Sequence, residues 1–240
     1  MEAVKTRVNY FSKGIRDGIP IGLGYLSVSF TFGMMAVTKG LPVWSAILIS
    51  MTNMTSAGQF AGLNLIVMAA PFTEMALTQL IINLRYGLMS LSLSQKLEKN
   101  ITRLERCIIA FGITDEIFAV SSGRQGSLGK EYMFGLMIVP YIGWAMGTLV
   151  GAVASTILPE FIRSALGIAI YGMFIAIIIP PARKNRAVRN VLIVAVALSC
   201  AFTWAPLLNQ VSAGFTIIIC TIAAAALGAW IYPISEEDEV

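Results

Sequence analysis

The stretch CIIAFGITDEIFAVSS, residues 107–122, decides how this chain has to fold. Asp115 and Glu116 stand at its centre, with only about 7 apolar residues on either side, whereas a membrane-spanning helix needs about 20. Residues 43–70 have the same character, because the polar and small residues NMTSAGQFAG at 53–62 interrupt an otherwise apolar run. Both stretches predict broken or re-entrant helices inside a membrane.

The composition of the whole chain supports a membrane environment. Of 240 residues, 57% are hydrophobic and 12% are charged, and the mean hydropathy is +0.77. A water-soluble domain of ordinary composition carries roughly 25% charged residues. Uncharged runs cover residues 19–38, 40–73, 132–159, 164–182 and 190–235. We therefore expect lipid, and not water, around most of the surface.

Backbone groups in hydrocarbon must satisfy one another, so the apolar runs are expected to be helices. The sequence predicts an all-α, polytopic membrane bundle with about six full spans, at residues 18–38, 74–95, 132–157, 162–180, 190–207 and 212–232. The 46-residue run from 190 to 235 holds two of them if it turns at Pro206 to Gln210. Residues 1–240 then form a single transmembrane transport domain.

The positions of the basic residues predict how the chain is oriented. Lys and Arg in short loops mark the cytoplasmic side, and 14 of the 17 fall in four clusters: before residue 17, at 96–106, at 124–130 and at 183–189. All four share one side only if residues 43–70 and 107–122 are hairpins that return to the face they came from. The basic N-terminus, residues 1–17, and the acidic tail, residues 233–240, are then both cytoplasmic.

This order of segments also suggests an inverted repeat, in which a span followed by a hairpin from outside precedes a span followed by a hairpin from inside. The tips TSAGQFAG at 55–62 and ITDEIFAV at 113–120 share a polar cluster followed by Phe-Ala. Paired interrupted segments in the two halves of a chain point to the binding site of a transporter.

Few charged side chains fall where hydrocarbon is expected, and each is costly there, by about 2.5–3.5 kcal/mol on insertion scales. They are Arg85, Asp115 and Glu116, with Glu74 near a span end. We expect Arg85 to pair with Asp115 or Glu116. The acidic pair is interpreted as a site for a substrate ammonium group or as a proton relay, or else as a structural ion pair. Thr114 and Asp115 are suited to cap a half-helix that starts at Glu116.

A second polar focus lies in the first interrupted stretch. Gly58 and Gln59 stand where the N-terminus of a half-helix can present N–H groups to an anion, although small residues there also suit a simple helix–helix contact. Asn83 adds an amide close to the depth of Arg85. The stripe Gly143, Gly147 and Gly151 predicts tight packing against a neighbouring helix or another chain.

Several function classes are excluded or disfavoured. The chain has no histidine, so zinc hydrolysis and Ser-His catalysis lose their usual groups, and we expect no enzyme and no resident cofactor or metal. Its three cysteines, Cys107, Cys200 and Cys220, lie in apolar segments without CxxC spacing. No basic stripe with interleaved aromatic residues supports nucleic-acid binding.

Four motifs together resemble the AzlC-type family of branched-chain amino acid permeases. They are GIRDGIPIGLGY at 14–25, SAGQFAG at 56–62, NLRYGLMS at 83–90 and ITDEIFA at 113–119, and the last is the most specific. The resemblance extends over nearly the whole chain. It implies a bacterial inner-membrane exporter of branched-chain amino acids that works with a small AzlD-type membrane subunit. Family members often have proline where this chain has Tyr25.

Residues and resemblance together lead to one expectation. The protein is expected to be a multi-pass plasma-membrane carrier that exports an aliphatic amino acid by alternating access, and the choice of a proton or another cation as coupling ion stays open. The expected substrate-binding residues are Gly58, Gln59, Asn83, Arg85, Thr114, Asp115 and Glu116. Two alternatives stay open at this point: a channel-like pore for small solutes, and a membrane assembly subunit with no transport of its own.

Overall fold

The described part of the chain is helical, as the sequence predicts. The computed structural model describes residues 2–159, 161, 175, 178–206 and 208–233. It divides into two compact units: unit 1 comprises Met1–Leu63 and Asn83–Gly167, and unit 2 comprises Asn64–Ile82 and Ile168–Val240. The expected span at 162–180 and the acidic tail after residue 233 lie outside the described residues, apart from a few positions of the former.

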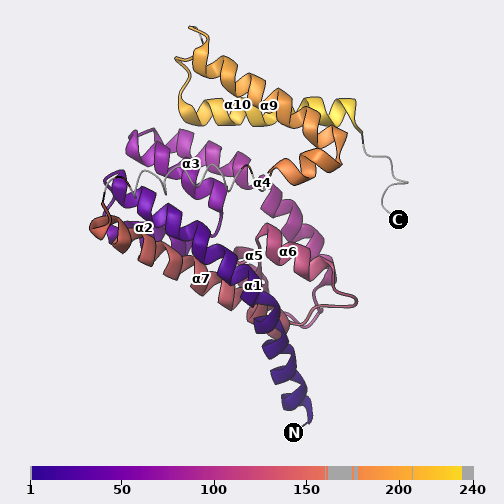
Figure 1. Cartoon of the computed structure of the whole chain (residues 1–240). Helices are drawn as coiled ribbons and strands as arrows, with labels where there is room; N and C mark the ends of the chain where they lie inside the picture. The colour runs from indigo at the N-terminus through magenta and orange to yellow at the C-terminus, as the bar shows by residue number, and fades with distance from the viewer. Residues whose placement is uncertain (1, 160, 162–174, 176–177, 207, 234–240) are drawn as a thin grey trace. The chain divides into compact units, whose positions relative to one another are not determined.

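Unit 1 is built on two long helices that run side by side, α1 (Glu2–Thr38) and α7 (Lys130–Ile157) (Figure 1). Glycines on both helices let the backbones approach. A Cβ added at Gly18 would lie 2.6 Å from the Leu136 carbonyl oxygen, and one at Gly143 would lie 2.5 Å from the Gly22 carbonyl oxygen. The glycine stripe of α7 therefore packs against a neighbouring helix of the same chain, which is one of the two contacts that the sequence predicts.

Helix α1 is longer than the predicted span. It begins at Glu2 and not near residue 18, so the basic N-terminal stretch continues the helix without a break. Charged side chains mark where a helix leaves the hydrocarbon, but they do not end it, because Lys and Arg are good helix formers in water. The boundary predicted at residue 18 is thus the edge of the apolar segment, and the helix itself extends further.

The first interrupted stretch is a broken helix. Helix α2 (Val43–Thr52) and helix α3 (Ser56–Val67) are separated by residues 53–55. Ala46 of α2 and Leu63 of α3 pack in one cluster with Phe32 and Ala36 at the end of α1. Two residues 17 positions apart would be about 25 Å apart along one continuous helix, so the chain changes direction at residues 53–55.

The second interrupted stretch is broken in the same way. Helix α5 (Arg103–Phe111) and helix α6 (Asp115–Ser122) are separated by residues 112–114. The start of α5 and the end of α6 are both tied to the same end of unit 1, because Glu105 pairs with Lys130 and the Ser122 carbonyl accepts a hydrogen bond from Lys96. Residues 107–122 therefore form a hairpin, and the prediction of two broken helices is confirmed.

The basic end of unit 1 is fastened by polar contacts. Lys96 Nζ donates to the carbonyls of Ser122 and Arg124, each at 2.6 Å. Arg124 lies over the ring of Tyr132, and both side chains contact the carboxylate of Asp17 on α1. These bonds join α1, the end of helix α4 (Phe72–Lys96), the second hairpin and α7 at one end of the unit.

Unit 2 contains an antiparallel pair, α9 (Arg186–Trp204) and α10 (Ala213–Ile231), joined by a turn that includes Pro206 (Figure 1). The prediction that the long uncharged run holds two helices is confirmed. Glu74, at the start of α4, is 4% exposed. Its carboxylate accepts from the Ser212 hydroxyl at 2.6 Å and from the Gly214 N–H at 2.9 Å, so it caps α10.

Four of the described helical segments are long and apolar enough to cross a membrane: Tyr10–Thr38, Lys130–Ile157, Arg186–Trp204 and Ala213–Ile231. Helix α4 has 25 residues, and so a length of about 37 Å, but it carries Glu74, Arg85 and Lys96. A helix of this length with a charge at its middle is expected to turn that charge toward protein and not toward lipid.

Candidate functional site

The breaks in the two hairpins are organised by the same local device. At the first break, Thr55 precedes α3, and its hydroxyl accepts from the Gly58 N–H at 3.2 Å. At the second, Thr114 precedes α6, and its hydroxyl accepts from the Ile117 N–H at 3.4 Å. Each threonine thus caps the third residue of a half-helix. Helix α6 begins at Asp115, one residue before the predicted start.

Each capping threonine also meets a tyrosine from a long helix. Tyr25 of α1 is 2.5 Å from the Thr114 hydroxyl, and it also hydrogen bonds with the carboxylate of Glu116. Tyr86 of α4 and Thr55 of the first break line the same cavity. The first span of one half therefore lies beside the break of the other half, and the reverse, which is the relation that an inverted repeat requires.

The Phe-Ala match between the hairpin tips does not describe this relation. Superposing Thr55 on Thr114 places Phe60 opposite Ala119, one position out of register with Phe118. The equivalence of the two halves lies in the capping threonines and their tyrosine partners.

An ion pair joins α4 to the second break. The Arg85 guanidinium donates to both oxygens of the Asp115 carboxylate, and the two side chains are 43% and 42% exposed. Arg85 also donates to the Tyr86 hydroxyl at 3.2 Å and lies over the ring of Tyr86. The predicted pairing of Arg85 is confirmed with Asp115 as the partner. Because Tyr86 lines the same cavity as Thr55, the Arg85 guanidinium bonds to the second break and to a neighbour of the first.

A cavity lies where the two breaks face α4. Its volume is about 250 Å³, and it is lined by Thr52, Asn53, Met54, Thr55, Asn83, Tyr86, Ala110, Phe111 and Ile113. We call it the polar cavity. Residues 52–55 come from the first break, 110–113 from the second, and Asn83 and Tyr86 from α4. The interrupted stretches predicted to meet do so here.

The remaining predicted site residues have different positions. Gln59 is 2% exposed, and its amide nitrogen donates to the Ser50 hydroxyl and to the Asn53 carbonyl at 3.2 and 2.7 Å. Neither Gly58 nor Gln59 lines the polar cavity. The Gly58 N–H and the Gln59 amide instead stabilise the conformation of the first break. Glu116 is exposed next to the second break, where Tyr25 orients its carboxylate.

Tyr25 is the main residue that sequence reasoning missed. It is 8% exposed, and its ring packs edge-on against Trp144 at a centroid distance of 5.2 Å. Met54 of the first break belongs to the same buried cluster. Tyr25 therefore hydrogen bonds with the second break and shares a buried cluster with a residue of the first. The available signal was a tyrosine in the middle of a glycine-rich span, but no residue of that span predicts that Thr114 and Glu116 are its partners.

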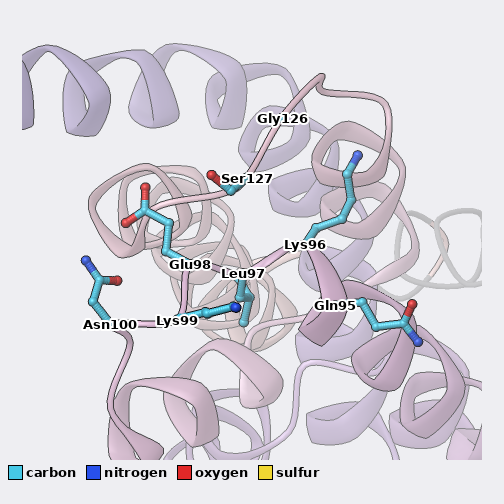
Figure 2. Close-up of a pocket in the computed structure, with 8 residues that line it drawn as sticks. All are labelled: Gln95, Lys96, Leu97, Glu98, Lys99, Asn100, Gly126 and Ser127. Atoms are coloured by element: carbon cyan, nitrogen blue, oxygen red, sulfur yellow. The ribbon is translucent and has the colours of Figure 1, made fainter.

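A second pocket, of about 810 Å³, lies at the basic end of unit 1 and is shown in Figure 2. It is lined by Gln95, Lys96, Leu97, Glu98, Lys99, Asn100, Gly126 and Ser127. Figure 2 shows the side chains of Lys96 and Glu98 pointing in different directions. The pocket begins about 16 Å along α4 from Arg85, and Lys96 is already bonded to two carbonyls. The pocket at the basic end is therefore separate from the charged groups at the two breaks.

Fold and site together define a class of protein: a helical membrane protein in which two broken helices meet around a polar cavity, with an ion pair next to the cavity residue Tyr86. The sequence pattern of the AzlC protein matches residues 20–158, a range that contains both breaks and the whole polar cavity. The chain belongs to the AzlC family.

Relatives with curated sequences are membrane proteins. An uncharacterized membrane protein of Archaeoglobus fulgidus is 32% identical over 92% of this chain and 94% of its own length. The inner membrane protein YgaZ of Escherichia coli is 24% identical over 92% of this chain and 91% of its own length. An uncharacterized membrane protein of Helicobacter pylori is 27% identical over 67% of this chain. No solved structure matches the chain.

Proposed function

We propose that the protein is a secondary transporter that exports branched-chain, aliphatic amino acids across the plasma membrane by alternating access. The observation that carries this proposal is the polar cavity, because both broken helices and the ion-paired α4 contribute to its walls. Discontinuous helices that meet at mid-membrane form the binding sites of many transporters. Membership of the AzlC family supports a role in membrane transport.

The charges around the cavity suit a zwitterion. Arg85 and Asp115 neutralise each other, so Glu116 adds one negative charge at the second break, where it can accept a substrate ammonium group. The amide of Asn83 and the hydroxyls of Tyr86 and Thr55 line the cavity, and Arg85 stands behind Tyr86. These groups are donors for a substrate carboxylate, and they are placed before the substrate arrives.

The proposal includes an orientation and a partner. The basic end of unit 1, with Lys96 and Arg124, faces the cytoplasm, and both chain termini lie on that side. A small AzlD-type membrane subunit assembles with this chain. No cofactor takes part, and movement of a proton or cation is the proposed source of energy for export. Substrate enters the polar cavity from the basic end and leaves on the opposite side.

Transport in liposomes tests the proposal. Purified protein is reconstituted with its small partner, and the efflux of labelled leucine or valine is measured for wild type and for Arg85→Gln, Asp115→Asn and Glu116→Gln. We expect rates to fall about tenfold or more, because a hydrogen bond to a charged group contributes roughly 1.5–3 kcal/mol. Lys130→Gln removes an ion pair at the basic end, away from the cavity, and serves as the matched control.

The outcomes separate the proposal from its two alternatives. Unchanged efflux in all three variants removes the proposed site. Flux that does not saturate with leucine, and that shows no exchange of internal for external leucine, indicates a channel. Loss of the small partner from the purified complex in these variants, with no transport by wild type, indicates an assembly subunit.

A further inference from the structure

A third cavity, which is apolar, adjoins the polar cavity. It lies between α4 and α5, has a volume of about 210 Å³, and is called here the α4–α5 cavity. Its lining consists of Ser90, Leu93, Ser94, Leu97, Arg106, Cys107, Ile109, Ala110 and Ile113. Ala110 and Ile113 line both cavities. A molecule with its charged groups in the polar cavity therefore has an apolar space directly beside it.

The walls of the α4–α5 cavity are fixed by the core of unit 1. Leu93 and Ile109 are each 1% exposed and belong, with Ile113, to the main buried cluster of the unit. Close-packed side chains of this kind do not shift to fit a ligand of different size without a cost in stability. The cavity therefore has a set width between α4 and α5.

Arg106 and Leu97 lie at the end of the cavity away from the breaks. The Arg106 guanidinium spans from α5 to backbone carbonyls at the end of α4 and beyond. It donates to Ser94 at 3.4 Å, to Glu98 at 3.2 Å and to Ile101 at 3.4 Å. These three hydrogen bonds hold the guanidinium in place, so it closes that end of the α4–α5 cavity. A long or polar side chain would have to displace it, whereas a short aliphatic one would not.

We propose that the α4–α5 cavity is the subsite for the aliphatic side chain of an amino acid whose ammonium and carboxylate groups occupy the polar cavity. This inference rests on the proposed function. The occupant follows from continuity, since the two cavities share the walls formed by Ala110 and Ile113, and from chemistry, since one cavity is polar and the other apolar. Its volume of about 210 Å³ is about seven times the roughly 30 Å³ that one water molecule takes in the liquid, so an aliphatic side chain of three or four carbons fits inside it with space left over.

Ala110 is the position at which the size of the subsite can be changed. It is an exposed residue of α5 that lines both cavities, so a larger side chain there narrows the passage between them without entering the core. One methylene group in an apolar pocket changes discrimination between substrates by about 10–200-fold. We expect Ala110→Val to weaken leucine binding at least tenfold and to leave glycine binding within about twofold of wild type.

Cys107 provides a direct report of occupancy. Its thiol lines the α4–α5 cavity, whereas Cys200 and Cys220 belong to α9 and α10 of unit 2. In the full chain with Cys200→Ser and Cys220→Ser, the rate of alkylation of Cys107 by N-ethylmaleimide is measured with leucine, valine, glycine or no addition. Leucine and valine should slow alkylation several-fold, and glycine should not, because it has no side chain to occupy the subsite.

Binding of each amino acid to the same full-chain protein is measured in parallel by thermal shift. Ala119→Val is the control for Ala110→Val, because Ala119 is an exposed alanine of α6 that lines neither cavity. The proposed subsite is overturned, while the proposed function stands, if leucine binds without slowing the alkylation of Cys107 and Ala110→Val changes leucine and glycine binding by the same factor. If no amino acid binds or is transported, both fail together.

Discussion

At the residue scale, Tyr25 links helix α1 of unit 1 to the second broken helix. Its hydroxyl meets the cap of α6 and the carboxylate of Glu116, while its ring packs on Trp144. The two functions are separable, because phenylalanine keeps the ring and loses the hydroxyl. Thr114 would keep its hydrogen bond from the Ile117 N–H, but Glu116 would lose its orienting partner.

We therefore predict that Tyr25→Phe lowers amino acid efflux about tenfold and leaves the protein folded. A hydrogen bond to a charged group contributes roughly 1.5–3 kcal/mol, and most of this is lost at the position of Glu116. Initial efflux rates in liposomes measure the effect, and thermal unfolding in detergent checks the fold. Tyr141→Phe is the control, since Tyr141 donates to the Met51 carbonyl at 3.1 Å and contacts neither acidic residue. Equal rates for both variants would contradict the role of Tyr25.

At the element scale, the pairing of α1 with α7 depends on glycines at the points of closest approach. A Cβ at Gly18 would lie 2.6 Å from the Leu136 carbonyl oxygen and 3.3 Å from the Pro140 ring, whereas a Cβ at Gly24, on the same helix, would meet no atom within 4 Å. The same substitution is thus expected to have opposite effects at two positions six residues apart.

Gly18→Ala is predicted to destabilise the protein by about 1–3 kcal/mol, the usual cost of overpacking a close-packed contact. Gly24→Ala should be neutral or stabilising by up to about 1 kcal/mol, because alanine is the better helix former. Thermal unfolding of the two detergent-solubilised variants measures both effects in one helix. A Gly24→Ala variant that unfolds as early as Gly18→Ala would indicate that helix flexibility, and not the contact with α7, requires glycine.

The start of α5 is held by an ion pair and a capping box. Lys130 Nζ lies 2.6 Å from the Glu105 carboxylate, and Thr102 exchanges hydrogen bonds with Glu105. These bonds, with Lys130 first, lower the pKa of Glu105 from its ordinary value of 4.5 to about 2. A pKa that is lower in the folded protein than in the unfolded chain means that the contribution to stability is present above about pH 4.5 and is lost as the pH falls toward 2.

We predict that the melting temperature of wild type exceeds that of Glu105→Gln at pH 7 and that the difference shrinks between pH 4.5 and 2. Glutamine cannot titrate, so the comparison removes the effect of every other carboxylate. Intrinsic fluorescence during heating, at pH values spaced across this window, measures the difference. A difference that is constant with pH would show that the capping bonds alone, and not the charge, stabilise the start of α5. The two side chains are partly open to solvent, so the effect is expected to be small and to weaken in high salt.

The helices and their breaks were largely predictable from sequence. Polar groups are costly in lipid, so apolar runs indicate helices and polar residues within such a run indicate a break. Asp115 and Glu116 in an apolar run indicate a break, and the observed start of α6 is one residue from the predicted one. The continuation of α1 to Glu2 was not predicted, since basic residues were interpreted as the end of a segment. Charge locates the membrane edge, while helix ends depend on caps.

The partners within the site were only partly predictable. An arginine in the middle of an apolar helix needs a carboxylate partner in a membrane, so the pairing of Arg85 followed from energetics, and the structure selects Asp115. Tyr25 and Thr114 are 89 positions apart, and no local rule relates them. Gln59 shows the opposite case, in which a polar residue near a half-helix N-terminus suggested an anion site, yet its amide bonds to Ser50 and Asn53 of its own hairpin.

At the scale of the whole molecule, the two hairpins fix which loops share a side of the membrane. Ala46 of α2 and Leu63 of α3 belong to one buried cluster, so we predict that the chain turns back at the first break and that the loop before α2 and the loop after α3 lie on the same side. The Glu105–Lys130 and Lys96–Ser122 contacts do the same for the loops on either side of the second hairpin. A full crossing by either hairpin would place its two flanking loops on opposite sides.

This predicts a pattern of thiol labelling in intact cells. In a chain with serine at Cys107, Cys200 and Cys220, single cysteines are introduced as Thr38→Cys and Met68→Cys, which flank the first hairpin, and as Asn100→Cys and Gln125→Cys, which flank the second. Thr38, Met68, Asn100 and Gln125 are exposed. A membrane-impermeant maleimide should label the first pair in intact cells, and the second pair only after the membrane is opened, because the proposed orientation places the basic loops in the cytoplasm. Whether the two members of a pair label alike tests the hairpin, and the side on which they label tests the orientation. If both pairs label in the reverse way, the hairpins are supported but the orientation is inverted. If the two members of one pair label differently, that stretch crosses the membrane, and its break does not reach the polar cavity.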